Sequence, residues 1–529
     1  MNLTGASLIA GEQGTKGGAE FRAVNPQSGE NLEPRFVSAT KVDVDRAAKS
    51  AHEAFEQYSR LSGRERARFL RMIADGLDAA SGQIAERAGL ETALPQARLQ
   101  GEVKRASNQF RLFADVIEEG SWVAARIDTA LPDRQPLPRP DLRSMLRPIG
   151  PVAVFGASNF PVAFSVAGGD TASALAGGNP VIVKAHPAHP GTSEIAARVI
   201  SESARACALH AGVFSLLFDS GIDVGKALVQ HGLICGVGFT GSHAGGRALM
   251  DLAANRPNPI PCFAEMSSSN PVFVLPSALK ERGAQLAAGL FGSFTLGGGQ
   301  FCTKPGIVFL PQHSQTEPFV AELRRLAGDS AGFTLLTPGI AASYRKSVQD
   351  RSKRGNLETS AAQAGSAGCS AAAVLFEAKI DDFIKNPELG HEVFGPTSLL
   401  IHYEQRAAMI QAAESLDGHL TATIFGSAAE LAEYGDLIEV LQRKVGRVIF
   451  NGFPTGVEVS HAMVHGGPYP ATSDSRFTSV GSQAILRFAR PVCYQGWPES
   501  MLPEELRDAN PLRISRLVNG RVTSDSVSK

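Results

Sequence analysis

The chain has 529 residues, with 51 basic and 52 acidic side chains and a net charge of −1. Its length predicts roughly three domains, and 43% hydrophobic against 19% charged residues exclude a disordered chain. The balanced charge argues against nucleic acid as a main partner.

Six cysteines that lie far apart in the chain indicate free thiols. No two of them form a CxxC pair, so we expect no zinc or redox motif, and so few thiols are typical of a cytoplasmic enzyme. We expect no signal peptide, because residues 1–12 lack a basic start and a long apolar core. The uncharged stretches 148–169 and 283–303 contain prolines, polar residues or a glycine triplet, so we expect neither to span a membrane.

The first part of the chain is predicted to be helical. Ser62 and Glu65 have the spacing of a capping box. Phe69, Ile73 and Leu77 then recur on one helical face. We expect this helix to pack on a core.

From about residue 145 short apolar runs alternate with helical patterns. We predict strands at 152–155, 181–183, 213–218 and 233–239, and helices at 163–176, 223–230 and 242–254. This alternation favours a parallel sheet covered on both faces, with ligands beyond the carboxyl ends of its strands. A second α/β region is predicted from about 271 to 460, with strands at 272–275 and 306–310 and a helix at 281–290.

Residues 236–241 match the nucleotide-binding pattern GxGxxG. In one interpretation this is a dinucleotide fingerprint, with Glu265 on the ribose. In the other, the first two glycines lie inside a strand, and only the helix N-terminus at Ser242 is left to bind a phosphate. We favour the second, because a lone GxGxxG is a weak signal in a chain with 54 glycines.

The glycine-rich approach to Cys302, LGGGQFC at 296–302, is the most specific chemical feature. Glycines beside a cysteine let the backbone and a substrate come close to the sulfur. A nucleophile and a buried structural cysteine are both compatible with this pattern alone.

Seven ordered segments resemble the aldehyde dehydrogenase superfamily over nearly the whole chain. They are VNPQSGE (24–30), GASNFP (156–161), VIVK (181–184), GFTGS (238–242), FAEM (263–266), GQFC (299–302) and EVFGP (392–396). The resemblance implies an α/β fold with two Rossmann-like parallel-sheet domains and a small β oligomerisation arm. Residues 1–121 and 148–266 would form the cofactor-binding domain, 267–460 the catalytic domain, and 122–147 with 484–510 the arm. Members of the family are dimers or tetramers, so we expect a homodimer or homotetramer.

The resemblance also implies a covalent mechanism. Cys302 would attack an aldehyde and form a thiohemiacetal. The Asn159 amide and the Cys302 backbone N–H would stabilise its oxyanion. Hydride transfer would leave a thioester, and Glu265 would activate the water that hydrolyses it.

By the same resemblance, nine residues would bind a nicotinamide cofactor: Lys184, His186, Gly221, Gly225, Thr240, Gly241, Ser242, Glu392 and Phe394. Family members often carry a glutamate three residues after the ribose lysine, where it favours NAD. Here that position is Pro187. Without this carboxylate, repulsion of a 2′-phosphate is relieved, so we expect NADP to be preferred and NAD to be possible. Phe160, Phe301 and Phe453 are expected to line the substrate entrance.

Two departures from the family text affect these expectations. Ser267, Ser268 and Ser269 stand where a glycine pair usually follows the base, so the turn that faces the cofactor is expected to differ. The loop after Phe453 lacks the usual family text, which makes the substrate harder to infer.

A narrower resemblance concerns the substrate. Segments 169–176, 184–194 and 461–474 are similar to α-ketoglutaric semialdehyde (2,5-dioxovalerate) dehydrogenases. NADP-dependent fatty aldehyde dehydrogenases share part of this text and are the main alternative. A CoA-acylating dehydrogenase is disfavoured by Glu265, and a cysteine hydrolase would need a histidine such as His391 or His465. No metal is expected, because glycines and prolines around His461 and His465 do not fit a helical metal pair.

Overall fold

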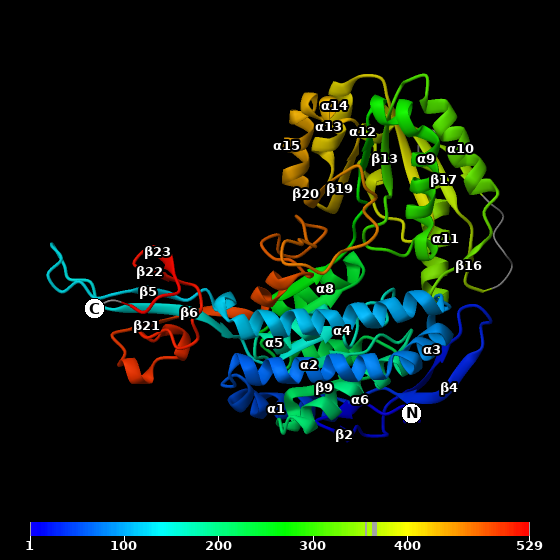
Figure 1. The fold of residues 1–529 in the computed structure, drawn as a ribbon. Helices are drawn as coiled ribbons and strands as arrows, with labels where there is room; N and C mark the ends of the chain where they lie inside the picture. Colours follow the sequence, from blue (N-terminus) through cyan, green and yellow to red (C-terminus); the bar gives the residue numbers. More distant parts are fainter. Residues whose placement is uncertain (1, 355–356, 362–367, 528–529) are drawn as a thin grey trace.

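A computed structural model describes residues 2–354, 357–361 and 368–527. Two α/β bodies lie against each other, and a narrow β-sheet extends from one of them (Figure 1). Among the described residues, no helix has both the length and the apolar character that crossing a membrane requires.

The N-terminal segment covers one body with helices. Its elements are β1 (Leu8–Ile9), β2 (Glu12–Gln13), β3 (Glu20–Val24), β4 (Asn31–Val37), α1 (Lys41–Tyr58), α2 (Gly63–Ala79), α3 (Ser81–Thr92) and α4 (Gln96–Glu119). The capping box of Ser62 and Glu65 is confirmed at the start of α2. Phe69, Ile73 and Leu77 are fully buried there, as predicted.

The first sheet has the order β11-β10-β7-β8-β9-β1-β2. Five strands run parallel: β7 (Val152–Phe155), β8 (Val181–Lys184), β9 (Phe214–Leu217), β10 (Gly236–Thr240) and β11 (Cys262–Glu265). The connecting helices are α5 (Gly169–Ala176), α6 (Pro190–Ala206), α7 (Asp223–Gln230) and α8 (His243–Ala254). The strand order reverses between β7 and β10, and such a switch point is where open α/β sheets bind ligands.

One predicted helix is wrong at its start. The pattern at 163–176 predicted a single helix, but α5 begins only at Gly169. The buried carboxylate of Glu102 accepts the backbone N–H groups of Val162 and Ala163, at 2.8 and 3.0 Å. These bonds hold residues 160–168 in turns instead of a helix. The predicted strand 233–239 is also too long at its start, since β10 begins at Gly236.

The second sheet has the order β15-β17-β18-β13-β12-β19-β20. Its strands are β12 (Val272–Val274), β13 (Ile307–Pro311), β15 (Glu358–Ala361), β17 (Val374–Lys379), β18 (Thr397–Tyr403), β19 (His419–Phe425) and β20 (Val445–Phe450). Around it lie α9 (Pro276–Thr295), α10 (Thr316–Gly328), α11 (Pro338–Ser352), α12 (Ile380–Lys385), α13 (Arg406–Ser415), α14 (Ala428–Glu433) and α15 (Gly435–Lys444), with the small pair β14 (Phe333–Thr334) and β16 (Ser370–Ala371). The predicted helix 281–290 is the middle of the longer α9.

The projecting sheet has the order β21-β6-β5-β22-β23. It combines β5 (Arg126–Asp128) and β6 (Leu142–Pro148) with β21 (Ala489–Gln495), β22 (Arg516–Val518) and β23 (Arg521–Thr523). Residues 484–488 lie in a 3₁₀ helix, and Ala484, Ile485 and Phe488 are buried in the core of the first body. The C-terminal strands of this sheet therefore begin after the predicted start at 484 and extend past the predicted end at 510.

Candidate active site

A cavity of about 530 Å³ opens at the switch point of the first sheet. Residues 156–160, which follow β7, and residues 240–242, at the end of β10 and just after it, line it. Cys302, Glu392 and Phe394 from the second body also line it. The cavity thus lies beyond the carboxyl ends of the strands, where the alternating pattern predicted a ligand.

The loop before Cys302 depends on three glycines in the left-handed region. Gly297, Gly298 and Gly299 have φ of 59°, 68° and 67°, a conformation that side chains with a Cβ rarely adopt. A Cβ on Gly299 would lie 2.2 Å from the carbonyl oxygen of Gly395. The nucleophile loop therefore packs directly against the backbone that follows Glu392 and Phe394.

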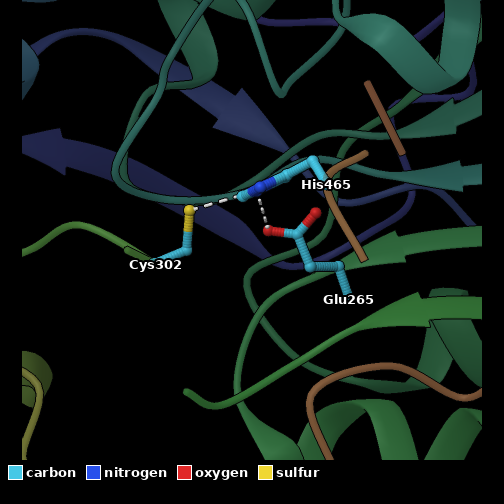
Figure 2. A group of neighbouring side chains, drawn as sticks. All are labelled: Glu265, Cys302 and His465. Carbon is cyan, nitrogen blue, oxygen red and sulfur yellow. Dashed lines mark hydrogen bonds and ion pairs between the residues drawn. The ribbon is translucent and has the colours of Figure 1, made fainter. Parts of the chain in front are cut away.

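The side chains of Cys302 and Glu265, which line the cavity, meet His465 (Figure 2). The Nε2 atom of His465 lies 3.4 Å from the Cys302 sulfur and 2.9 Å from Oε1 of Glu265. One ligand atom from each residue lies within 4.8 Å of the other two. Folding thus brings together Glu265 of β11, Cys302 of the glycine-rich loop and His465, which is far from both in the sequence.

The Glu265 carboxylate is held from two sides. His465 contacts Oε1, and the Ser479 hydroxyl donates to Oε2 at 2.5 Å. Burial raises the pKa of Glu265, but the interactions with His465, Ser479 and Cys302 outweigh it and hold this pKa below its ordinary value. Glu265 is therefore an ionised carboxylate that can only accept hydrogen bonds, and Nε2 of His465 must carry the proton that it donates.

The Cys302 thiol is in its protonated form in this environment. Burial raises its pKa well above the ordinary value, and the negative charge of Glu265 raises it further. Arg105 acts in the opposite direction and lowers it. A base beside the sulfur is thus needed to form the thiolate, and Glu265 is close enough to be that base.

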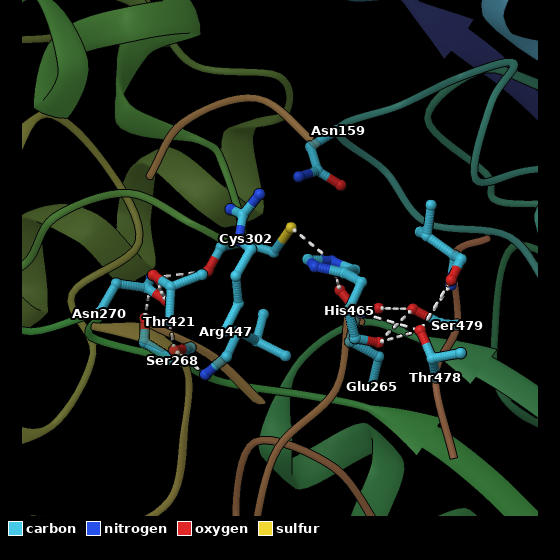
Figure 3. A network of polar contacts seen from close by, with 12 residues as sticks. Asn159, Glu265, Ser268, Asn270, Cys302, Thr421, Arg447, His465, Thr478 and Ser479 are labelled. Atoms are coloured by element: carbon cyan, nitrogen blue, oxygen red, sulfur yellow. Dashed lines mark hydrogen bonds and ion pairs between the residues drawn. The ribbon is translucent and has the colours of Figure 1, made fainter. Parts of the chain in front are cut away.

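Asn159 and His465 both point toward the Cys302 sulfur (Figure 3). Nδ2 of Asn159 donates to the Gln300 backbone carbonyl at 2.9 Å, and the backbone carbonyl of Asn159 accepts from Arg98 at 2.9 Å. An amide nitrogen carries two hydrogens. One of them therefore remains to donate to an oxyanion that forms when the sulfur attacks a carbonyl. The buried amide is thus fixed in place before any substrate binds.

Asn270 fixes the backbone of the nucleophile. Its side-chain nitrogen donates to the carbonyls of Cys302 and Lys304 at 2.8 and 2.9 Å (Figure 3). Its Oδ1 accepts from Ser268 at 2.8 Å and from Thr421 at 3.0 Å. Ser268 and Asn270 therefore tie the backbone of Cys302 to β19 in one network.

The structure places six of the nine predicted cofactor residues on the cavity. These are His186, Thr240, Gly241, Ser242, Glu392 and Phe394. Ser242 is the N-cap of α8, whose free N–H groups suit a phosphate. Gly236 and Gly238 lie inside β10, so the GxGxxG match is not a phosphate turn.

The other three predicted cofactor residues lie near this cavity rather than on its lining. Lys184 ends β8, and burial lowers its pKa while Asp219 partly offsets the effect. Gly221 donates its N–H to Asp219 at 2.8 Å. A Cβ on Gly225 would lie 3.0 Å from the Phe155 ring, so this glycine lets α7 approach β7.

The charge of the buried Lys304 acts on Glu392. Burial raises the pKa of Glu392, while Lys304, Ser267 and the backbone of Ser268 lower it. Nζ of Lys304 donates to the carbonyls of Val393 and Thr397 at 2.8 and 2.9 Å. These bonds anchor the segment that carries Glu392 and Phe394 beneath the cavity.

Two of the three predicted substrate phenylalanines are neighbours. Phe160 lies next to Asn159 in the chain, and Phe301 lies next to Cys302. Their rings lie edge to face, with centroids 5.2 Å apart. Phe453 instead packs against Phe425 at 4.8 Å and against Gly289 of α9. This packing accounts for its partial burial, and its contact with substrate stays a prediction.

Sequence reasoning missed several residues of the site. Thr337, Gly339, Ile340 and Ser343 of the α11 region line the cavity, but nothing in their local pattern points to a ligand. His465 was singled out only for a hydrolase alternative or a metal pair with His461. The structure instead groups it with Glu265 and Cys302, which are also metal-ligating residue types. No sequence spacing connects these three positions.

Comparison with known proteins agrees with this geometry. The model of the aldehyde dehydrogenase family matches residues 13–475. The chain belongs to the aldehyde dehydrogenase family. It is 48% identical over 527 residues to "Alpha-ketoglutaric semialdehyde dehydrogenase 2" of Azospirillum brasilense, covering 98% of this chain and 100% of the relative. It is 46% identical over 523 residues to "Alpha-ketoglutaric semialdehyde dehydrogenase" of Acinetobacter baylyi, covering 98% and 99%.

Solved structures share the fold of this dehydrogenase at low sequence identity. The aldehyde dehydrogenase KauB of Pseudomonas aeruginosa has a TM-score of 0.80 at 21% identity and covers 94% of this chain and 97% of its own. A betaine aldehyde dehydrogenase of Staphylococcus aureus in complex with NAD+ has a TM-score of 0.80 at 19% identity, with 94% and 98% covered. The predicted α/β aldehyde dehydrogenase fold is therefore confirmed.

Proposed function

We propose that this aldehyde dehydrogenase oxidises α-ketoglutaric semialdehyde (2,5-dioxopentanoate) to 2-oxoglutarate. The observation that carries the chemistry is the ionised Glu265 carboxylate within 4.8 Å of the Cys302 sulfur. The two relatives at 48% and 46% identity bear the name of this substrate. A cysteine, a carboxylate and a pre-oriented amide are the groups that covalent oxidation of an aldehyde needs.

In the acylation step, Glu265 takes the proton of the Cys302 thiol and the thiolate attacks the aldehyde carbon. The free N–H of Asn159 and the Cys302 backbone N–H stabilise the negative charge that forms on the aldehyde oxygen. Loss of one such donor typically costs about 3–4 kcal/mol of barrier. When the carbonyl re-forms, the hydride departs and the thiohemiacetal becomes a thioester on Cys302.

After acylation, Glu265 releases the thiol proton to solvent. In the deacylation step, the ionised Glu265 removes a proton from water, which attacks the thioester, and this proton then passes to the departing Cys302 thiolate. The acid product leaves, and Cys302 regains its thiol. A bound nicotinamide cofactor would supply the hydride acceptor for the preceding step. The lining of the cavity fits such a cofactor, because the donors of His186 and Ser242 line the same cavity as Cys302.

We propose that NADP is preferred and that NAD is also used. Pro187 stands where a carboxylate would repel a 2′-phosphate, and Lys184 and His186 precede it. Burial and the neighbouring His189 and Lys184 lower the pKa of His186 well below its ordinary value. His186 is thus neutral, and Nδ1 accepts from the Ala188 N–H at 3.2 Å, which leaves Nε2–H as a donor.

Cofactor reduction with 2,5-dioxopentanoate and with long aliphatic aldehydes tests the proposed function. We expect rapid turnover of the oxo-acid, no turnover after Cys302→Ala, and a 10²- to 10⁴-fold lower rate after Glu265→Gln. Because Glu265→Gln keeps the side-chain volume, it also tests whether the carboxylate rather than its shape is needed. Rates that rise with the apolar chain length would favour the fatty aldehyde alternative and overturn the proposed substrate. Acyl transfer to coenzyme A in place of water would favour the CoA-acylating class.

One contact favours a second candidate, a cysteine hydrolase, because His465 lies 3.4 Å from the Cys302 sulfur. In a nucleophile–histidine–acid triad the acid holds the second ring nitrogen. Here Nε2 contacts both the sulfur and Glu265, while Nδ1 is buried without a partner among the described residues. His465 therefore cannot receive the thiol proton while it donates to Glu265. Turnover without any dinucleotide would contradict this argument.

We also propose a cytoplasmic location and a homodimer or homotetramer. All six cysteines are free thiols, which suits a reducing compartment. The projecting sheet is the element that we propose as the oligomerisation arm.

A further inference from the structure

We propose that Arg105 binds the carboxylate of the substrate. This inference rests on the proposed function, since it concerns how an oxo-acid aldehyde is distinguished from a neutral one. Arg105 lies on α4, in the first body, and its neighbours are the aromatic side chains of the oxyanion loop.

Arg105 lies next to the reacting groups. Its guanidinium carbon is 4.9 Å from the centroid of the Phe164 ring and 5.9 Å from that of Phe160. Both phenylalanines line the cavity. The Phe164 ring is in turn 6.2 Å from the ring of His465, which contacts the Cys302 sulfur. Arg105 is not itself among the residues that line the cavity, so the carboxylate of a Cys302-bound substrate would have to pass these rings to reach it.

The guanidinium has unused hydrogen-bond donors. Nε and Nη2 of Arg105 are shielded from solvent and have no acceptor among the described residues. An arginine stays protonated in a protein, unlike other basic side chains. A buried charge without a partner is unfavourable in free energy. A carboxylate that accepts two parallel N–H bonds would satisfy both the charge and the donors.

Two other arginines near Cys302 already donate hydrogen bonds to backbone carbonyls. Arg98, two turns before Arg105 on α4, donates to the Asn159 carbonyl. Arg447 of β20 donates to the carbonyls of Pro454 and Gly456, at 2.8 and 3.2 Å. Among the described residues, Arg98 has no buried nitrogen without a partner and Arg447 has only Nε, whereas Arg105 has both Nε and Nη2.

The acidic groups around Arg105 leave it available. Glu102, one turn earlier on α4, uses Oε1 for the backbone N–H groups of Val162 and Ala163. Its Oε2 is buried without a partner among the described residues, and its charge acts on Arg105 without a hydrogen bond to it. Glu265 is held by His465 and Ser479. The negative charge of Glu458 also raises the pKa of Arg105, but the Glu458 side chain is exposed to solvent. A structural role for Arg105, through its contacts with the two aromatic rings, is the alternative that an experiment must separate.

The test compares two five-carbon aldehydes, 2,5-dioxopentanoate and pentanal, in the full-length enzyme. The readout is the ratio of their kcat/KM values, because any effect of Arg105 on the thiol acts on both substrates and cancels. We expect Arg105→Met to lower this ratio by about 10- to 100-fold, the range for a lost hydrogen-bonded charge. The loss should appear mainly in KM for the oxo-acid. Arg111→Met, on the outer face of the same helix, should leave the ratio unchanged.

The outcomes separate the two proposals. If the unmodified enzyme does not prefer 2,5-dioxopentanoate to pentanal, the proposed function fails. If it does and Arg105→Met keeps the ratio, Arg105 is structural and the inference is overturned. If Arg105→Met does not fold, Arg105→Lys is measured instead. A single ammonium cannot form the bidentate contact of a guanidinium with a carboxylate, so the ratio should fall in this variant as well. An unchanged ratio in Arg105→Lys would then overturn the inference.

Discussion

His465 touches both reacting side chains through one atom. Its Nε2 donates to Glu265 and faces the Cys302 sulfur, and its backbone N–H donates to the Thr478 hydroxyl at 2.8 Å. The backbone N–H of Ser479 donates to the His465 carbonyl at 2.8 Å, and its hydroxyl donates to Glu265. The segment that ends at Ser479 therefore sets the protonation state of the base, although it carries no residue that reacts with substrate.

Replacing His465 should shift the pH dependence of the reaction. His465→Phe keeps a ring in place but removes the donor that lowers the pKa of Glu265. With burial left to dominate, this pKa rises, so the ionised base is lost at higher pH. We expect the acid limb of kcat to move upward by about 1 to 2 pH units, the equivalent of one charged hydrogen bond. His461→Phe, an exposed position in the same segment, is the control, and an unmoved limb in His465→Phe would contradict this role.

Among single residues, the sequence pointed to the side chains that we propose as catalytic, but not to the residues that hold them. Cys302, Glu265 and Asn159 lie in short motifs that can be recognised without a fold, and the structure brings them together. Arg105 and Asn270 carry no such motif, because their importance comes from what lies opposite them in space. Phe453 has an aromatic side chain at a motif position, yet the structure packs it against Phe425.

Connections between elements shape the cofactor end of the cavity. The turn between β8 and α6 holds Lys184, His186 and Pro187, and α6 begins with Pro190. The rings of His186 and His189 stack with centroids 5.5 Å apart. The alternating pattern predicted β8 and α7 well, because both are short runs with clear boundaries. It failed at α5, because a distant carboxylate, Glu102, redirects the backbone there.

A carboxylate in this turn should change the cofactor preference. Pro187→Glu would place a negative charge three residues after Lys184. Two unit charges about 4 Å apart repel by ~1 kcal/mol even in water, and a phosphate carries nearly two. We therefore expect the ratio of kcat/KM for NADP to that for NAD to fall by at least about tenfold. Pro187→Gln, which has the same size without the charge, should change the ratio little, and an equal effect of both variants would contradict the electrostatic explanation.

For the whole molecule, alternation of strands and helices predicted two parallel sheets but could not predict their strand order. The order depends on which strands pair, and β7 lies beside both β8 and β10. That choice creates the switch point at which residues from both bodies meet. The projecting sheet was predicted only from the family resemblance, since its short strands would equally suit an ordinary sheet edge.

The projecting sheet extends away from the two α/β bodies (Figure 1). Along its strands and connections, the exposed large hydrophobic residues are Leu131, Leu137, Trp497, Met501, Leu512 and Val522. Clustered exposed apolar surface of this kind marks interaction sites, and the outer strands β21 and β23 leave backbone groups free to pair with another copy. This is the physical basis for the proposed arm.

A charge on this sheet should weaken self-association. Val522 on β23 is 74% exposed, so Val522→Asp should be tolerated by the fold, but it would bury an unpaired carboxylate in an interface, which is costly. By light scattering after size exclusion, we expect a dimer or tetramer for the unmodified chain and a dissociation constant at least about tenfold higher for the variant. Val42→Asp on α1, where the valine is 68% exposed, should not alter the assembly. A monomeric unmodified chain would contradict the proposed oligomer, whereas unchanged assembly in Val522→Asp would place the interface on another surface.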